Sequence, residues 1–191
     1  TVFMEEISSM ISAIILAKNE QQTILQVLKR LSWTDEQIVV DNGSIDNTVK
    51  IANENGAKTV SIPEKDFSKM RNEAAKKSKA DWLLYIDTDE EISPALQKEI
   101  IEITKKTPDT TVDHVAYTLK RKNYYLGHLW PYTDGMIRLI YKPSLFGWFG
   151  DLHETAKING SIGTLQHLLI HKTHRSLEEM LTKTNEWSEI E

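Results

Sequence analysis

Cysteine is absent from this chain of 191 residues. Disulfide bonds and thiolate metal sites are therefore excluded, and the absence fits a reducing compartment such as the cytoplasm. No apolar run approaches the roughly 20 residues that a helix needs to cross a bilayer, and residues 1–10 lack the basic start and apolar core of a signal peptide. We therefore expect a soluble, cytoplasmic protein, with contact to the inner face of the plasma membrane as the alternative.

Basic residues are also scarce. The chain carries 23 Lys and Arg against 28 Asp and Glu, which gives a formal net charge of −5. Because nucleic-acid binding depends on clustered Lys and Arg, we expect no nucleic-acid partner. The composition is otherwise ordinary, with 40% hydrophobic and 27% charged residues. A chain of this length can bury a substantial core, so a single domain is expected.

Strand-like and helix-like patterns alternate through the first half of the chain. Apolar and β-branched runs predict strands at residues 11–17, 37–41, 58–62 and 82–86. Apolar positions at helical spacing lie between these runs. Such alternation with short connections is typical of right-handed βαβ units and a parallel sheet.

The second half of the chain has a different character. Residues 115–119 and 136–141 are predicted to be strands, and an aromatic stretch at 124–132 separates them. Apolar residues at helical spacing from 177 to 190 predict a terminal helix that packs against the domain. The sequence has no internal repeat and no linker-like segment, so we expect one domain built of two parts.

The fourth predicted strand runs directly into two carboxylates, Asp87 and Asp89, with Thr88 between them. The unbroken apolar run before them indicates a strand that is buried on both faces of a sheet. Open α/β sheets bind their ligands at the carboxyl edge of the strands, where this Asp-x-Asp sequence would lie. Carboxylate oxygens there suit Mg²⁺ or Mn²⁺, and such an ion would suit a diphosphate. A charged turn before a helix explains the same residues equally well.

Polar residues also follow the other predicted strands. Asn19 and Glu20 come after the first strand, and Asp41 and Asn42 come after the second. Arg71 lies on the predicted helix before the fourth strand. A carboxylate can accept hydrogen bonds from a base edge or from ribose hydroxyls. The convergence of these groups at one edge of the sheet therefore indicates a site for a nucleotide and a metal.

Together these motifs resemble those of GT-A glycosyltransferases of family 2, and the resemblance covers nearly the whole chain. The residues that carry it are 14–20, 39–48, 71–72 and 87–89. Within the family, the chain is similar to the subgroup that resembles the lipopolysaccharide-core β-glucosyltransferases. Residues 150–154 and 171–187 also match the pattern of that subgroup.

The resemblance implies a GT-A fold, which is a Rossmann-like, mostly parallel central sheet flanked by helices, with a smaller mixed acceptor-side half. It implies a single glycosyltransferase domain over residues 1–191. Residues 11–110 would form the nucleotide-sugar-binding half, and residues 111–191 the acceptor-side half with the C-terminal helix. The implied activity is inverting transfer of a sugar from a nucleotide-diphosphate donor, by analogy a UDP-sugar, to a hydroxyl of a glycan or a lipid-linked saccharide.

The resemblance also assigns roles to individual residues. Asp89 would bind the metal, Mn²⁺ or Mg²⁺, and His171 would complete its coordination, with His174 as the weaker candidate. A single His beside an apolar strand is more often structural, but imidazole is an acceptable ligand for Mn²⁺. The implied nucleotide-sugar contacts are Ala17, Asn19, Glu20, Asp41, Asn42, Arg71, Asp87 and Thr88.

An inverting transfer needs a general base that takes the proton of the acceptor hydroxyl. Many relatives use an acidic residue of a Glu-Asp pair after the aromatic segment, and this chain has no such pair there. We predict that Glu154 is the base, with Asp151 as the alternative. In a simpler interpretation, Glu154 and His153 pair only with each other or with solvent.

Two other functions are open at this point. A nucleotidyltransferase also uses carboxylates and Mg²⁺ on an α/β sheet, but that class typically has a glycine-rich loop after the first strand, and residues 16–20 contain no glycine. A catalytically inactive module would keep the fold and bind a nucleotide-sugar without turning it over. The presence of Asp87, Asp89 and a candidate base argues against such a module.

Several further segments have two interpretations. The aromatic residues at 124–132 and 148–149 either line an acceptor cleft by stacking on sugars or cover the sheet as core. The basic residues at 120–122 form a solvated rim or contact phosphates or lipid headgroups. Glu90 is expected to be only a charge at the start of a helix, and Asp46 to support its own turn.

Overall fold

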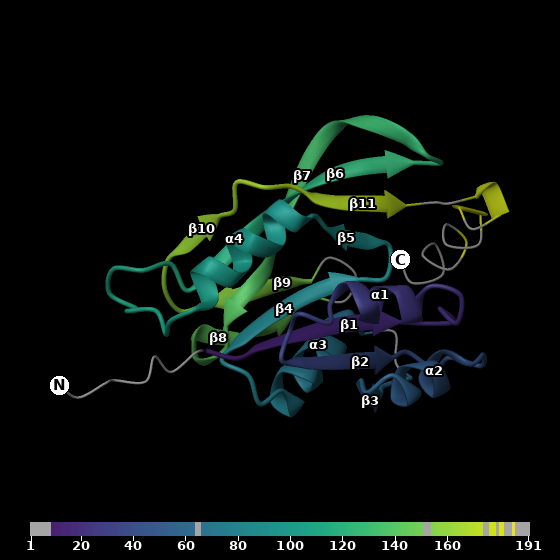
Figure 1. Ribbon diagram of the computed structural model, residues 1–191, viewed down its shortest axis with the longest axis horizontal. Coiled ribbons are helices and arrows are strands. Elements are labelled where there is room, and N and C mark those ends of the chain that lie inside the picture. Colours follow the sequence, from purple (N-terminus) through teal and green to yellow (C-terminus); the bar gives the residue numbers. More distant parts are fainter. Residues whose placement is uncertain are drawn as a thin grey trace.

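The computed structural model describes residues 9–63, 66–150, 154–173, 176–178, 180, 181 and 185. The main sheet has nine strands in the order β3-β2-β1-β4-β7-β6-β11-β5, with β10 beside β6 (Figure 1). A second, two-stranded sheet consists of β8 and β9. Within the described ranges, no helix combines the length and the apolar character needed to cross a membrane.

Strands and helices alternate up to β4, and strands dominate the rest of the described chain. The strands are β1 (Ile11–Ala17), β2 (Glu36–Asp41), β3 (Lys58–Ser61), β4 (Trp82–Asp87), β5 (Glu90–Ile92), β6 (Ala116–Tyr125), β7 (His128–Tyr141), β8 (Leu145–Phe149), β9 (Thr155–Ile158), β10 (Ile162–Thr164) and β11 (Leu169–Thr173). The helices are α1 (Ile24–Arg30), α2 (Thr48–Glu54), α3 (Phe67–Lys77) and α4 (Pro94–Thr104), and a 3-10 turn (Lys142–Ser144) precedes β8.

The strands β1 to β4 form the predicted parallel sheet. β1 lies between β2 and β4, with Ala17 opposite Asp41 on one side and Leu16 opposite Asp87 on the other. The chain leaves β1 toward β2 and β3 and then returns with β4 on the other side, so the carboxyl end of β1 is a topological switch point. The polar residues that follow β1, β2 and β4 therefore meet at one edge of the sheet, as predicted.

Both faces of the central strands are buried. Successive side chains of a strand point to opposite faces. In β4, Trp82, Leu84 and Ile86 belong to one apolar cluster with α1, α2 and α4. Leu83 and Tyr85 belong to a second cluster with α3, β8 and β9. This burial on two sides explains why the sequence of β4 is apolar without alternation.

β7 continues the sheet in the antiparallel direction, but its pairing with β4 is short. The ladder runs from Trp82 opposite Tyr141 to Leu84 opposite Leu139. Beyond Leu84, β4 continues to Asp87 beside β1, while β7 pairs with β6. The two strands therefore part just before the carboxyl end of β4.

β6 and β7 form a long hairpin, and both strands are longer than predicted. Their turn consists of Leu126 and Gly127, with φ of 46° and 78°. Two-residue turns with both residues at positive φ match the twist of a hairpin, and Asn-Gly is the usual sequence for them. Because Leu126 occupies the position where Asn is usual, the sequence lacks the typical signal for this turn. The aromatic stretch 124–132 is therefore the end of a hairpin and does not separate two short strands.

The core interpretation of the aromatic residues is right for Trp148 and wrong for the hairpin and for Phe149, which is 53% exposed. Trp148 is buried, and its ring centroid lies 4.9 Å from that of Tyr85 in an edge-to-face contact. In contrast, Trp130 is 50% exposed and Tyr132 is 72% exposed. The hairpin therefore contributes apolar surface and not core at its end.

A pair of hydrogen bonds joins α3 to β8. The Asn72 side chain accepts from the Trp148 N–H at 2.9 Å and donates to the Trp148 carbonyl at 2.9 Å. Asn72 thus satisfies both backbone groups of a buried residue. The contact also holds the first half of the chain against the second.

Replacing Asn72 with Ala should lower the free energy of unfolding by about 1–3 kcal/mol, because the Trp148 backbone loses both partners in a buried setting. Urea unfolding of the two proteins measures this difference. Asn159→Ala is the matched control, since Asn159 lies exposed in the turn after β9. A surface change of this kind should cost less than about 0.5 kcal/mol, and equal losses in both variants would contradict the assignment.

Candidate functional site

The turn after β1 is tied to the loop after β2. Asn19 adopts a φ of 56°, a left-handed conformation that Asn tolerates better than most residues. Its N–H donates to Ser44 Oγ at 2.9 Å, and its Oδ1 accepts from the Ile45 N–H at 2.9 Å. The Glu20 N–H donates to Thr48 Oγ1 at 2.7 Å. These hydrogen bonds hold the turn after β1 against the loop after β2, so the first two predicted motifs are in contact.

The acidic residues of the β2 loop support that structure. Asp41 is buried, and its Oδ1 accepts from the Ser44 N–H at 3.0 Å. Asp46 accepts from the N–H groups of Thr48 at 2.9 Å and Gln21 at 3.1 Å. The prediction that Asp46 supports its turn is confirmed.

Backbone and side-chain contacts connect this loop to β1 and to the Asp-x-Asp sequence. The Asn42 N–H donates to the Ala17 carbonyl at 2.9 Å. Thr88 Oγ1 donates to Glu20 Oε1 at 3.0 Å. The strand-end residues that were predicted to hold a nucleotide-sugar are therefore neighbours.

Asp87 lies between two arginines at the end of β4. Arg138 donates to its Oδ2 at 2.6 Å, and Arg71 NH2 lies 3.6 Å from its Oδ1. Burial alone would raise the pKa of Asp87, but the two guanidinium groups outweigh it and hold this pKa well below the ordinary value. Asp87 is therefore ionised at neutral pH.

Arg138 and Glu90 form the buried centre of the site. Arg138 is 1% exposed and donates to Glu90 Oε1 at 2.7 Å, while Glu90 Oε2 accepts from the Asp87 N–H at 2.9 Å. The expectation that Glu90 is only helix-start charge is wrong. Glu90 belongs to β5, which pairs with β11 opposite His171 and points the carboxylate into the protein.

Sequence reasoning missed Arg138, although a signal was present. It is the one charged residue in an otherwise apolar run, residues 136–141, which was predicted to be a strand. Charged side chains are almost never fully buried unless they are paired. An arginine inside an apolar strand therefore indicates a carboxylate partner elsewhere in the fold.

Arg71 connects Asp87 to the candidate base Glu154. Its Nε and NH2 both lie 2.8 Å from Glu154 Oε1. Its guanidinium also packs against the ring of Trp148, 5.0 Å from the centroid, and is 3% exposed as a side chain. The guanidinium group of Arg71 thus lies between the carboxylates of Glu154 and Asp87. Asp151, the alternative base, falls outside the residues that the structure describes.

Asp89 and His171 meet at the other side of the site. Asp89 Oδ2 and His171 Nε2 are 3.6 Å apart, and His171 Nδ1 lies 2.8 Å from Asn123 Oδ1. An amide oxygen only accepts hydrogen bonds, so Nδ1 carries the proton and Nε2 of the neutral ring keeps its lone pair. Asn123 Nδ2 donates to Asp134 Oδ1 at 3.0 Å, which fixes this orientation of the amide. The other candidate, His174, is outside the described residues.

The pair of Asp89 and His171 fits a divalent metal. A separation of 3.6 Å between the two ligand atoms is within the reach of one ion with bonds of about 2.0–2.1 Å. Among the described residues, no group of three or more His, Asp or Glu is placed to hold an ion. Further ligands would have to come from a bound diphosphate and from water, as is usual for Mg²⁺.

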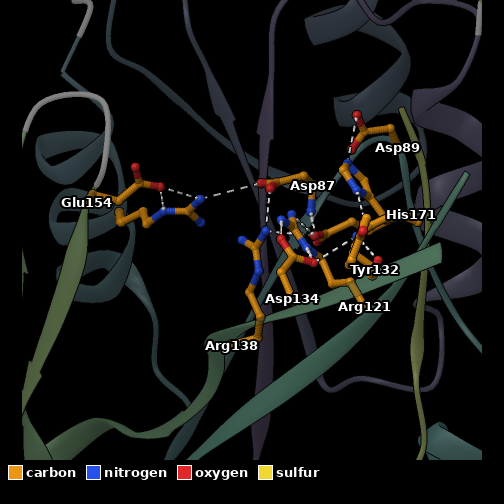
Figure 2. Close-up of polar contacts among 11 residues, drawn as sticks. Asp87, Asp89, Arg121, Tyr132, Asp134, Arg138, Glu154 and His171 are labelled. Carbon is orange, nitrogen blue, oxygen red and sulfur yellow. Dashed lines mark hydrogen bonds and ion pairs between the residues drawn. The ribbon is translucent and has the colours of Figure 1, made fainter. Parts of the chain in front are cut away.

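One continuous polar network runs through the whole site (Figure 2). Arg121 extends it from Glu90, at 3.5 Å, to Asp134, whose carboxylate it binds with two nitrogens. The hydrogen bond from Arg121 is the main reason why the pKa of Asp134 falls to about 2. The members of the network, in order, are Glu154, Arg71, Asp87, Arg138, Glu90, Arg121, Asp134, Asn123, His171 and Asp89.

Replacing Arg138 with Met should lower the free energy of unfolding by about 3–5 kcal/mol at neutral pH, because Asp87 and Glu90 would keep buried charges without their cation. Arg30→Met is the matched control. Arg30 contacts Glu91 at 3.4 Å on the surface, where an ion pair contributes about 0–1 kcal/mol. Guanidinium chloride unfolding measures both losses, and a loss at Arg138 no larger than that at Arg30 would contradict the assignment.

The loss at Arg138 should also depend on pH. In the unmodified chain the pKa of Asp87 is lowered, so its contribution is present above the unfolded pKa and disappears as the pH falls. Burial already raises the pKa of Glu90 in the unmodified chain. Without Arg138 the pKa of Glu90 and that of Asp87 would both rise, so the variant gains stability as the pH falls. The difference between the two proteins should therefore shrink between pH 7 and about pH 4.5. A difference that is constant over this range would be inconsistent with the ion pairs.

Comparisons with known sequences identify the family of the chain. The sequence model of glycosyl transferase family 2 matches residues 12–158. The chain is 32% identical to an uncharacterized glycosyltransferase of Rickettsia typhi, over 93% of this chain and 65% of that protein. An uncharacterized glycosyltransferase of Rickettsia conorii is 30% identical, over 96% of this chain and 70% of that protein. The chain thus spans about 65% of the length of the first of these relatives.

Comparisons with solved structures concern the fold. Glucosyl-3-phosphoglycerate synthase from Mycobacterium tuberculosis, in complex with Mn²⁺, UDP and phosphoglyceric acid, superposes with a TM-score of 0.58 at 20% identity, over 93% of this chain and 75% of that one. The same enzyme with Mg²⁺ and UDP gives a TM-score of 0.58 at 19% identity, over 90% and 74% of the two chains. The expected GT-A fold is confirmed. With the match of the sequence model over most of its length, the chain belongs to glycosyl transferase family 2.

Proposed function

We propose that the chain is an inverting, metal-dependent glycosyltransferase that moves a sugar from a UDP-sugar to a hydroxyl of a glycan or a lipid-linked saccharide. The observation that carries this proposal is the meeting of Asp87, Asp89, His171, Arg71 and Glu154 at the carboxyl end of β4. The solved enzyme of similar fold binds UDP with Mn²⁺ or Mg²⁺, which supports the class of donor and cofactor by analogy.

The proposed donor site is the group of turns after β1, β2 and β4. Ala17, Glu20 and Asp41 would hold the base and the ribose, and Asn19, Asn42 and Thr88 fix the turns that present them. Asp87 would face the ribose or the sugar. Residues 11–110 supply all of these groups, whereas Glu154 and His171 come from 111–191. This distribution supports a division into a donor half and an acceptor-side half.

The proposed metal ligands are Asp89 and His171. Asn123 acts as a positioning residue, because it holds the ring of His171 with Nε2 directed toward Asp89. A bound divalent ion would neutralise the charge that develops on the departing diphosphate. Arg71 carries a second positive charge close to Asp87 and could meet the same phosphates.

The proposed base is Glu154. It takes the proton of the acceptor hydroxyl as the hydroxyl oxygen forms a bond to the anomeric carbon. On the opposite face the bond from that carbon to the diphosphate oxygen breaks, and UDP leaves with the electron pair. Attack opposite the leaving group inverts the configuration. Arg71 fixes the carboxylate of Glu154 through Oε1, and Asp151 is the alternative base.

We also propose that the chain belongs near the lipopolysaccharide-core β-glucosyltransferase-like subgroup and acts in the cytoplasm. The support is the pattern of residues 150–154 and 171–187. Glu154 and His171, which the network joins to the donor side, lie in these two segments. If the chain belongs near this subgroup, we expect its acceptor to be a molecule that already carries sugars.

Removing the Asp89 carboxylate should abolish the effect of the metal on nucleotide binding. UDP with Mn²⁺ should raise the melting temperature of the unmodified chain, because a ligand that binds only the native state stabilises it. Asp89→Asn should respond to UDP with Mn²⁺ no more than to UDP alone. Glu102→Gln, an exposed carboxylate on α4, is the control and should respond like the unmodified chain. An undiminished Mn²⁺ response in Asp89→Asn would refute the assignment.

Removing the base should abolish turnover and spare binding. Glu154→Gln keeps a hydrogen-bond acceptor for Arg71, so the thermal shift with UDP and Mn²⁺ should persist. The release of UDP from UDP-glucose should fall by about 10²–10⁴-fold, the usual contribution of a general base. A comparable loss in Asp151→Asn, with Glu154→Gln active, would transfer the role to Asp151. If the unmodified chain binds UDP with Mn²⁺ and releases UDP from no nucleotide-sugar in a panel, it is an inactive binding module.

A further inference from the structure

The end of the β6–β7 hairpin exposes a group of large apolar side chains. The exposed fractions are 38% for Tyr125, 57% for Leu129, 50% for Trp130 and 72% for Tyr132. The ring centroids of Tyr125 and Trp130 are 5.7 Å apart, and those of Trp130 and Tyr132 are 6.4 Å apart, so the rings form a continuous surface. We call these four residues the hairpin tip. Contiguous exposed apolar surface of this kind marks an interaction site.

A bulge in β7 directs the tip toward solvent. Lys122 pairs with Thr133 and Tyr124 pairs with Leu129, so Asn123 alone faces residues 130–132. Extra residues in one strand bend it and change the direction of its side chains. Figure 1 shows that the end of the hairpin stands out from the body of the protein. The exposure of the aromatic rings therefore follows from the backbone and not from a chance rotamer.

The tip is apolar on both sides of the two-stranded ribbon. Leu129 pairs with Tyr124, and the ring of Trp130 contacts the ring of Tyr125. Because Tyr124 and Tyr125 are consecutive residues of β6, Leu129 and Trp130 lie on different sides of the ribbon, and both are at least half exposed. The turn adds Leu126 at a φ of 46°, where Asn or Gly is favoured over an apolar residue. A glycan or a groove on a partner protein would cover only one side of the ribbon, whereas a lipid surface surrounds its end. Apolar side chains on both sides therefore favour a lipid surface.

The charge of the hairpin fits an anionic lipid surface. β6, β7 and their turn contain four basic residues and one acidic residue, in a chain with a net charge of −5. Two of the basic residues, Arg121 and Arg138, are engaged with carboxylates of the site. Lys120 is exposed, and Lys122 lies over the ring of Tyr124, 5.7 Å from its centroid. These lysines lie further from the turn than the apolar tip does, at the level where lipid phosphates would lie.

We propose that the hairpin tip inserts into the headgroup region of an anionic lipid bilayer. Trp130 and Tyr132 would lie at the membrane–water boundary, where Trp and Tyr are enriched, and Lys120 and Lys122 would contact lipid phosphates. This binding is independent of the proposed reaction. Only its consequence rests on the proposed function: it would present the site to an acceptor that is carried on a lipid.

The position of the tip supports that consequence. The hairpin end points to the same side of the sheet as the carboxyl ends of β4 and β11 (Figure 1). The Tyr132 carbonyl accepts from Asn123 Nδ2 at 3.4 Å, and Asn123 holds His171. A bilayer that surrounds the tip would therefore lie beside the candidate metal ligands.

The test is flotation of the full chain with vesicles of phosphatidylcholine and phosphatidylglycerol in equal parts. The unmodified chain should float with these vesicles at low salt and less with phosphatidylcholine alone. Trp130→Ser should weaken binding by about tenfold or more, since Trp is an anchor of the interface. Lys122→Ala should weaken it by about fivefold. Phe146→Ser, which changes a 73% exposed aromatic residue on β8, is the control and should bind like the unmodified chain.

Two outcomes would overturn the proposal. One is no flotation of the unmodified chain with the anionic vesicles. The other is equal flotation of Trp130→Ser and the unmodified chain, which would leave a glycan as the ligand of the aromatic rings. The thermal shift of Trp130→Ser with UDP and Mn²⁺ should equal that of the unmodified chain. Loss of flotation with a normal shift therefore separates membrane docking from donor binding.

Discussion

The arrangement of this site depends on the buried ion pairs of Arg138 with Asp87 and Glu90. The Asp-x-Asp sequence and the glutamate that follows it concentrate negative charge at the end of one buried strand, and like charges at such spacing repel strongly in a medium of low dielectric constant. Arg138 offsets that repulsion from within the protein. Arg71 then extends the compensation to Glu154 on one side, and Arg121 extends it to Asp134 on the other.

The first half of the fold and the grouping of its strand-end residues could be predicted because they follow from local chain order. A strand buried on both faces is a continuous apolar run, and the residue after it must lie at the edge of the sheet. Parallel connections bring successive strand ends to the same edge. Asn19, Asp41 and Asp87 therefore fall together without any knowledge of distant contacts.

The second half could be predicted only in part, because its structure depends on pairings between distant segments. Glu90 lies three residues before Ser93, the N-cap of α4, so the local sequence around it predicts the start of a helix. Its burial comes from the pairing of β5 with β11, about eighty residues further along the chain. The burial of Arg138 is likewise explained only by its carboxylate partners on β4 and β5, and the hairpin turn is formed by an unusual Leu-Gly pair. Local propensity does not contain this information.

The short ladder between β4 and β7 has a consequence for how such a protein can diversify. The main-chain bonding between these strands covers three residue pairs and ends at Leu84. Beyond that point the two halves are joined by side chains such as Arg138 and Asn72 and by the short pairing of β5 with β11. A junction of this kind tolerates replacement of whole loops and strands on its far side. Natural variation can therefore change the segments that follow β4 while the geometry around Asn19 and Asp87 stays unchanged.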